Sequence, residues 1–133
     1  MIGSRSIYSD HRLRSQPSPV VLPDHDLLEA AQRALPGALV RRIATSGLVG
    51  GGRDAGVEAM EGFGVLRAAA DAGVPAIEVR VVSNEVEEQD RARWRFAEAF
   101  ALLQSMAHGL TPDNPSVSGT VTRVVHGVNI YPC

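Results

Sequence analysis

The sequence predicts an α/β fold in which helices flank a sheet of short strands, and two observations support this prediction. Between residues 24 and 109, apolar residues recur in turn at helical and at strand spacing, in the order helix, strand, helix, strand, helix. Turn-forming residues separate these patterns, as at Pro36-Gly37 and at Gly73-Val74-Pro75. The chain has 133 residues, of which 44% are hydrophobic, so it can form one domain with a modest core.

The first predicted pair of elements is a helix followed by a strand. The helix is expected to begin near Leu27, because Asp24 or Asp26 can cap its first turn, and to stop at Pro36. Residues 38–45 follow as a strand. In a sheet built from such units, ligands collect beyond the carboxyl ends of the strands.

The remaining predicted elements are two helices and one strand. A glycine-rich loop over residues 46–56 leads to a second helix over residues 59–72, which Gly73 can end in a left-handed conformation. A strand over residues 76–82 and a third helix over residues 91–107 come next. The apolar positions that predict the two helices are Ala59, Phe63, Leu66 and Ala70 in the second and Phe96, Ala99, Phe100, Leu103 and Met106 in the third.

The composition divides the chain into three parts. Residues 1–23 are rich in serine, arginine and proline, and we expect an irregular N-terminal segment there; a transit peptide is the less favoured interpretation of that composition. Residues 24–109 form the predicted α/β domain. Residues 110–133 are an atypical C-terminal tail, whose valine-rich part can pair as a short hairpin.

Charge and residue usage exclude several functional classes. The 13 basic residues, all arginine, face 15 acidic residues, and a net charge of −2 argues against a nucleic-acid partner. The lack of lysine excludes a lysine nucleophile, a Schiff base and a Walker-type phosphate site. The single cysteine, Cys133, cannot form an intramolecular disulfide, and no apolar run approaches the roughly 20 residues of a membrane span. We therefore expect a cytoplasmic protein with no membrane partner.

Motifs for metals and phosphates are weak. The four histidines, His11, His25, His108 and His126, have no metal-ligand spacing, so neither a metal nor a cofactor is predicted. The run Gly50-Gly51-Gly52-Arg53 lacks both the P-loop and the dinucleotide-binding spacing.

Two residues near the ends of predicted elements are the candidates for chemistry. Glu61 stands in the first turn of the second helix, where the helix dipole alone can explain an acid. A carboxylate fixed there by amides would also accept two hydrogen bonds from a vicinal diol such as ribose. Asn84 follows the strand over residues 76–82, where an asparagine can simply form a turn or can face the edge of a heterocycle.

Several of these segments together resemble a known family. They are similar to the C-terminal part of the nucleoside phosphorylase/nucleosidase superfamily and, within it, to the futalosine hydrolases. The Met-Glu-Gly unit is shared across the superfamily, whereas Ser-Asn with Asp-Arg-x-x-Trp points to the futalosine branch. The residues that support the resemblance are Met60-Glu61-Gly62, Gly73-Val74-Pro75, Arg80-Val81-Val82-Ser83-Asn84, Asp90-Arg91 and Trp94.

The resemblance implies a partial nucleoside phosphorylase-like sheet flanked by helices, lacking the N-terminal half of the fold. It implies a purine nucleosidase that cleaves an N-glycosidic bond and releases hypoxanthine, as in menaquinone biosynthesis. Glu61 would hold the ribose hydroxyls, Met60 would pack beside the sugar and base, and Asn84 would be the catalytic residue that steadies the departing purine. Family members commonly assemble, so a homo-oligomer is expected.

Two alternatives stay open. The chain can be a truncated, catalytically inactive fragment of the same fold that binds nucleosides or another protein. It can also be a phosphorylase, which would need a phosphate site built from arginines such as Arg41, Arg42 and Arg53.

Overall fold

The computed structural model describes residues 1–9, 17–48, 50–51, 55–86, 88, 90–110 and 124–128. His11, Arg53 and Cys133 lie outside this part of the chain. Its elements, in chain order, are β1 (Ile2–Ser9), β2 (Val20–Val21), α1 (His25–Ala34), β3 (Val40–Ser46), β4 (Val57–Ala59), α2 (Gly62–Asp71), β5 (Ile77–Val81), the 3-10 turn η2 (Arg91–Arg93), α3 (Phe96–Gly109) and β6 (Val124–Val128).

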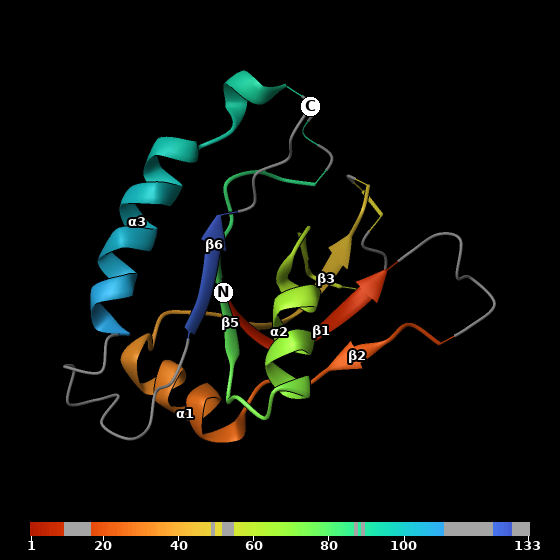
Figure 1. Ribbon diagram of the computed structural model, residues 1–133. Coiled ribbons are helices and arrows are strands. Elements are labelled where there is room, and N and C mark those ends of the chain that lie inside the picture. Colours follow the sequence, from red (N-terminus) through yellow and green to blue (C-terminus); the bar gives the residue numbers. More distant parts are fainter. Residues whose placement is uncertain are drawn as a thin grey trace.

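The strands form one mixed sheet, so the predicted α/β class is confirmed (Figure 1). Its order is β4-β3-β1-β5-β6, and β2 pairs with the later part of β1. Strands β1, β3 and β4 are parallel to one another, and β5 is parallel to β6. The two groups meet where Ile2 pairs antiparallel with Val79. The register of β1 on β3 shifts between Gly3 and Arg5, and such an irregularity bends a strand.

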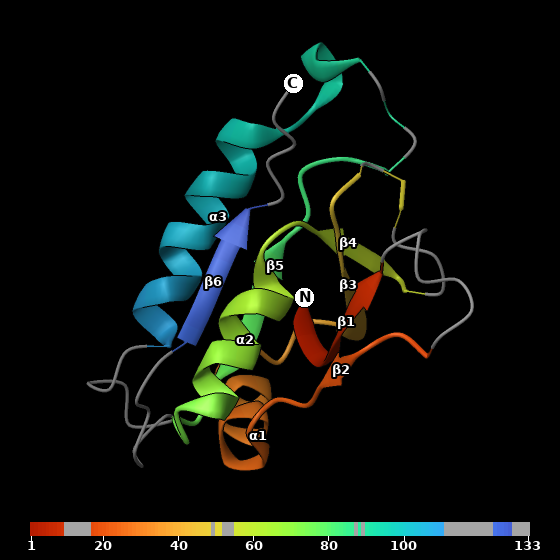
Figure 2. The ribbon, with the colours of Figure 1, turned by 45° about the vertical axis from the view of Figure 1, so that its right-hand side comes forward.

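Helices cover both faces of the sheet. Alternation along β5 turns Val79 and Val81 toward the face that carries α1 and α3, where Leu27 and Ala99 are also buried. The opposite face carries α2, whose Leu66 packs with Val21 of β2 and Ala76. Figure 2 shows α2 in front of the sheet and α3 alongside β6.

Local sequence features placed three elements correctly. Asp24 caps α1, because its carboxylate accepts a hydrogen bond of 3.0 Å from the amide of Leu27, and the helix ends before Pro36. Strands β3 and β5 cover most of the two predicted strands, residues 38–45 and 76–82.

The expectation of an irregular segment over residues 1–23 is wrong for its first third. Ile2–Ser9 forms β1, which contacts three other strands and lies in the middle of the sheet. Ile2 and Ser6 are buried in it. The serine- and arginine-rich composition did not predict this strand, because a strand's stability comes mainly from packing against its neighbours.

Two predicted helices begin later than expected. The second starts at Gly62, because residues 57–59 pair with β3 as β4. The third starts at Phe96, because a 3-10 turn, the extended residue Trp94 and the N-cap residue Arg95 precede it. Phe100, which we assigned to its buried face, is 45% exposed.

One segment of the C-terminal tail joins the sheet. Val124–Val128 runs parallel to β5 over five residue pairs, and the rest of the predicted hairpin lies outside the described residues. Among the helices described, none has both the length and the apolar character needed to cross a membrane.

Candidate functional site

Glu61 lies in the turn between β4 and α2. It is the N-cap residue of α2, with φ −120° and ψ −18°, whereas the sequence predicted a place inside the first turn. Its side chain is exposed and, with the residues described, makes no capping hydrogen bond, so the first-turn amides do not fix this carboxylate as expected. Met60 beside it is half-buried.

The start of α2 is nevertheless tied firmly to the sheet. The amide of Phe63 donates a hydrogen bond of 2.8 Å to Oγ1 of Thr45 at the end of β3. The ring of Phe63 lies 5.6 Å from the ring of Tyr8 on β1. These contacts fix the backbone that presents Met60 and Glu61.

Asn84 lies in the turn that follows β5, and both ends of its amide are engaged locally. The buried Ser83 hydroxyl donates to Oδ1 of Asn84 at 2.6 Å. Nδ2 of Asn84 donates to the carbonyl oxygen of Glu85 at 2.9 Å. An asparagine amide has two N–H groups and an oxygen with two lone pairs, so these two hydrogen bonds use only half of its capacity.

A cavity of about 540 Å³ opens beside Asn84. This volume lies in the range of small-molecule sites, and the lining carries charges of both signs. The amide of Arg95 donates to the carbonyl oxygen of Ser83 at 2.9 Å, which links two of the residues that line the cavity. The described residues that line it are Val82, Ser83, Asn84, Glu85, Glu88, Arg93 and Arg95.

The three residues predicted to bind substrate do not share this cavity. Asn84 lines it, but Met60 and Glu61 are absent from its described lining. The predicted site residues therefore occupy two places, the turn before α2 and the cavity after β5.

The Asp-Arg-x-x-Trp unit shapes the loop around Asn84, a role that the sequence analysis did not assign to it. Asp90 caps η2 through a hydrogen bond of 3.0 Å from the amide of Ala92. The indole N–H of Trp94 donates to the carbonyl oxygen of Glu88 at 2.9 Å. The Arg91 guanidinium lies 5.4 Å from the centre of the Trp94 ring, within the range of a cation–π interaction.

Glu88 is held in this loop by two donors. The amide of Asp90 donates to its carboxylate at 2.9 Å, and the Arg93 guanidinium lies 3.3 Å away. These donors, with the Asp90 amide contributing most, lower the pKa of Glu88 from its ordinary value of 4.5. The carboxylate therefore stays ionised at neutral pH and keeps Arg93 beside the cavity.

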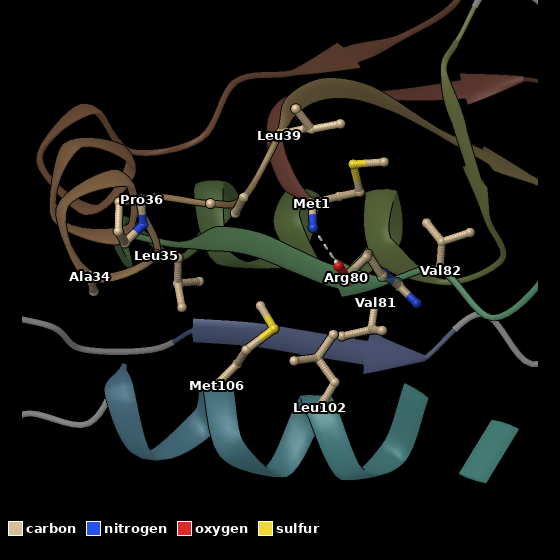
Figure 3. Close-up of a pocket in the computed structure, with 12 residues that line it drawn as sticks. Met1, Ala34, Leu35, Pro36, Leu39, Arg80, Val81, Val82, Leu102 and Met106 are labelled. Atoms are coloured by element: carbon tan, nitrogen blue, oxygen red, sulfur yellow. Dashed lines mark hydrogen bonds between the residues drawn. The ribbon is translucent and has the colours of Figure 1, made fainter. Parts of the chain in front are cut away.

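A second cavity, of about 530 Å³, lies between the end of α1, β5 and α3 (Figure 3). Its walls are mostly apolar and include Leu35, Leu39, Leu102 and Met106. Of the described residues that line it, none is among the three that the sequence predicted for substrate binding.

Comparison with known proteins gives two partial relationships. The chain is 56% identical over 55 residues to futalosine hydrolase from Streptomyces coelicolor, a match that covers 41% of this chain and 23% of that protein. It is 62% identical over 37 residues to the putative D-galactosamine-6-phosphate deaminase AgaS from Escherichia coli K12, covering 28% of this chain and 10% of that protein.

The AgaS protein of Streptomyces coelicolor is 36% identical over 109 residues, which is 81% of this chain and 23% of that protein. No family model and no solved structure matches the chain. The chain thus spans less than a quarter of the length of these relatives. Similarity to futalosine hydrolase supports the predicted relationship over part of the chain, whereas the AgaS similarity was not foreseen.

Proposed function

We propose that this chain is the purine-nucleoside-binding part of an N-glycosidase of the futalosine hydrolase type. The observation that supports it most is the 56% identity over 55 residues to a futalosine hydrolase. The exposed Glu61 on a fixed turn and the polar cavity at Asn84 are compatible with this chemistry.

In this proposal Glu61 binds the sugar. An ionised carboxylate accepts two hydrogen bonds, one from each hydroxyl of a vicinal diol. Its side chain needs no rearrangement for this, because it is exposed and makes no capping bond with the described residues. Met60, half-buried next to it, supplies an apolar contact to the sugar.

Asn84 acts on the base. Cleavage of the N-glycosidic bond places negative charge on the departing purine, and a hydrogen bond from Nδ2 stabilises that charge. Asn84 cannot donate a proton as an acid would, so it lowers the barrier by hydrogen bonding alone. Nδ2 has a second N–H group, which can bond the base while the first stays bonded to Glu85.

The test is to incubate the purified chain with futalosine or inosine and to measure hypoxanthine by chromatography and nucleoside binding by calorimetry. We expect Glu61→Gln to weaken binding of both nucleosides, because the uncharged amide keeps only one acceptor. Glu29→Gln is the matched control, since Glu29 is a partly exposed glutamate on α1. Binding that is equal in the two variants would remove Glu61 from the site, and a chain that binds neither nucleoside would refute the proposal.

Binding without hypoxanthine release would favour the truncated, inactive form of the same site. In this proposal the residue that activates the attacking water is not among the described residues, and the chain spans only 23% of the futalosine hydrolase. Hydrolysis by the chain alone is therefore expected to be slow relative to nucleoside binding.

A second candidate function rests on the other relationship. The AgaS similarity extends over 81% of the chain, so a site for D-galactosamine 6-phosphate is the competing proposal. Release of ammonia from this sugar phosphate, with no binding of inosine, would favour it over the nucleosidase.

A further inference from the structure

A buried glutamate on β5 lies directly beneath the first residue of α2. Glu78 is 1% exposed, and its side chain points to the face of the sheet that carries α2. A carboxylate is rarely buried to this extent unless it is paired. The reason for its position has to lie in what it contacts.

One oxygen of this carboxylate is paired and the other is not. Nε of Arg80 donates to Oε1 of Glu78 at 2.8 Å, and both side chains are at least 95% buried, with exposures of 5% and 1%. Oε2 of Glu78 has no hydrogen-bond partner among the described residues. Such a buried pair contributes little to the stability of the fold, because the cost of desolvating the two groups opposes their attraction.

The missing side chain of Gly62 leaves room on α2 for this carboxylate. A Cβ atom on Gly62 would lie 2.6 Å from Oε2 of Glu78 and closer still to Oε1, so only glycine fits here. The amino end of a helix carries partial positive charge, which favours an anion at that place. Gly62 directly follows Met60 and Glu61, so whatever fixes Gly62 also fixes these two residues.

We propose that Glu78 is a positioning residue, which sets where Met60 and Glu61 stand and thereby the affinity of the site for ribose. This inference rests on the proposed function. The carboxylate supports the turn from below at Gly62, and Thr45 holds the next amide, that of Phe63. Together they define the position of the Glu61 backbone, and an error of about 1 Å at such a position is known to cost up to a hundredfold in activity.

The experiment compares Glu78→Gln with Glu58→Gln. Glu58 is a suitable control because it is also buried, 3% exposed on β4, but its carboxylate accepts from the amide of Gly50. Each variant is titrated with inosine and with hypoxanthine by calorimetry, because Glu61 holds only the ribose. Hydrogen exchange at the amides of Gly62 and Phe63 is measured in parallel by NMR.

We expect Glu78→Gln to raise the Kd for inosine about tenfold while the Kd for hypoxanthine stays unchanged, and to speed exchange at both amides. Glu58→Gln should leave the ratio of the two Kd values and the exchange of these amides unaltered. A merely structural role of Glu78 would weaken the binding of both ligands equally, and that result would overturn the inference.

If Glu78→Gln does not fold, Gly62→Ala is used in its place, because it disturbs the same contact from the helix. The ratio of the Kd values for inosine and hypoxanthine then tests the positioning role in the same way. If the native chain binds no inosine, the proposed function fails. The positioning role is then judged by exchange alone, and unchanged exchange at Gly62 and Phe63 in Glu78→Gln would refute it independently.

Discussion

The contact between α2 and β5 makes a quantitative prediction about two glycines of one helix. Gly62 and Gly64 both lie in the first turn of α2. An added Cβ at Gly62 would meet the carboxylate of Glu78 at 2.6 Å or less, whereas at Gly64 it would meet nothing within 4 Å. Gly62→Ala and Gly64→Ala should therefore change the free energy of unfolding in opposite directions.

The size of each effect follows from the packing. At Gly64, exchange of an exposed helical glycine for alanine stabilises a protein by about 0.5–1 kcal/mol. At Gly62 the same gain is opposed by overpacking, which costs about 1–3 kcal/mol. The carboxylate of Glu78 cannot easily retreat, because Arg80 holds it and β5 is paired on both sides. We expect Gly62→Ala to be less stable than Gly64→Ala by about 2 kcal/mol, or roughly 8 °C in Tm.

Urea denaturation followed by circular dichroism measures this difference. Equal stabilities of the two variants would refute the close packing of Gly62 on Glu78. A double-mutant cycle with Glu78→Ala separates the contact from other effects of the alanine. Once the carboxylate is removed, the Gly62→Ala penalty should disappear, and a penalty that persists would assign it to another neighbour.

Three further predictions concern α1 and the loop around Asn84. Asp24→Ala should lower the free energy of unfolding by about 1 kcal/mol in urea denaturation, because it removes the cap of α1, while Asp26→Ala, the control in the first turn, should lower it less. Trp94→Phe should remove the hydrogen bond to the Glu88 carbonyl, cost about 1 kcal/mol and speed amide exchange in the loop; unchanged exchange would mean that the indole does not order it. The lowered pKa of Glu88 means that the folded state favours the ionised carboxylate. Its stabilising effect is therefore complete above pH 4.5 and is lost as the pH falls through the lowered pKa, so loop amide exchange should rise only in that acidic range. A rise in exchange near neutral pH would contradict the stabilising role of the Glu88 carboxylate.

The elements that the sequence predicted well are those with local causes. The start of α1 depends on one hydrogen bond between residues three apart, Asp24 and Leu27, and its end depends on Pro36. Strand β5 has β-branched residues at every second position, a pattern that is recognisable without knowledge of its neighbours.

The elements that were missed have causes far away in the chain. Strand β1 is stable because Ile2 packs with Leu27 and Val79, and no pattern within residues 1–9 shows this. The buried pair of Glu78 and Arg80 was equally invisible, because its place under α2 depends on how the helix crosses the sheet.

The roles of the candidate site residues stay predictions, but their places in the fold can be compared with the structure. Asn84 follows a strand, as the sequence predicted, whereas Glu61 precedes α2 and does not lie inside its first turn. The resemblance implied that one nucleoside contacts both residues. The described lining of the cavity at Asn84 does not include Glu61, and β5, which leads to Asn84, pairs antiparallel with β1.

This separation determines how strongly the chain can hold a nucleoside by itself. A diol at the exposed Glu61 exchanges hydrogen bonds with water, and each such bond yields only about 0.5–1.5 kcal/mol. Two of them amount to less than the roughly 4 kcal/mol of a millimolar affinity. The base can add a hydrogen bond from the Asn84 amide, because Ser83 and Glu85 engage only part of its donor and acceptor capacity. We therefore expect the chain alone to bind inosine with a Kd in roughly the millimolar range, weak but measurable by calorimetry, and no binding at such concentrations would contradict the proposal.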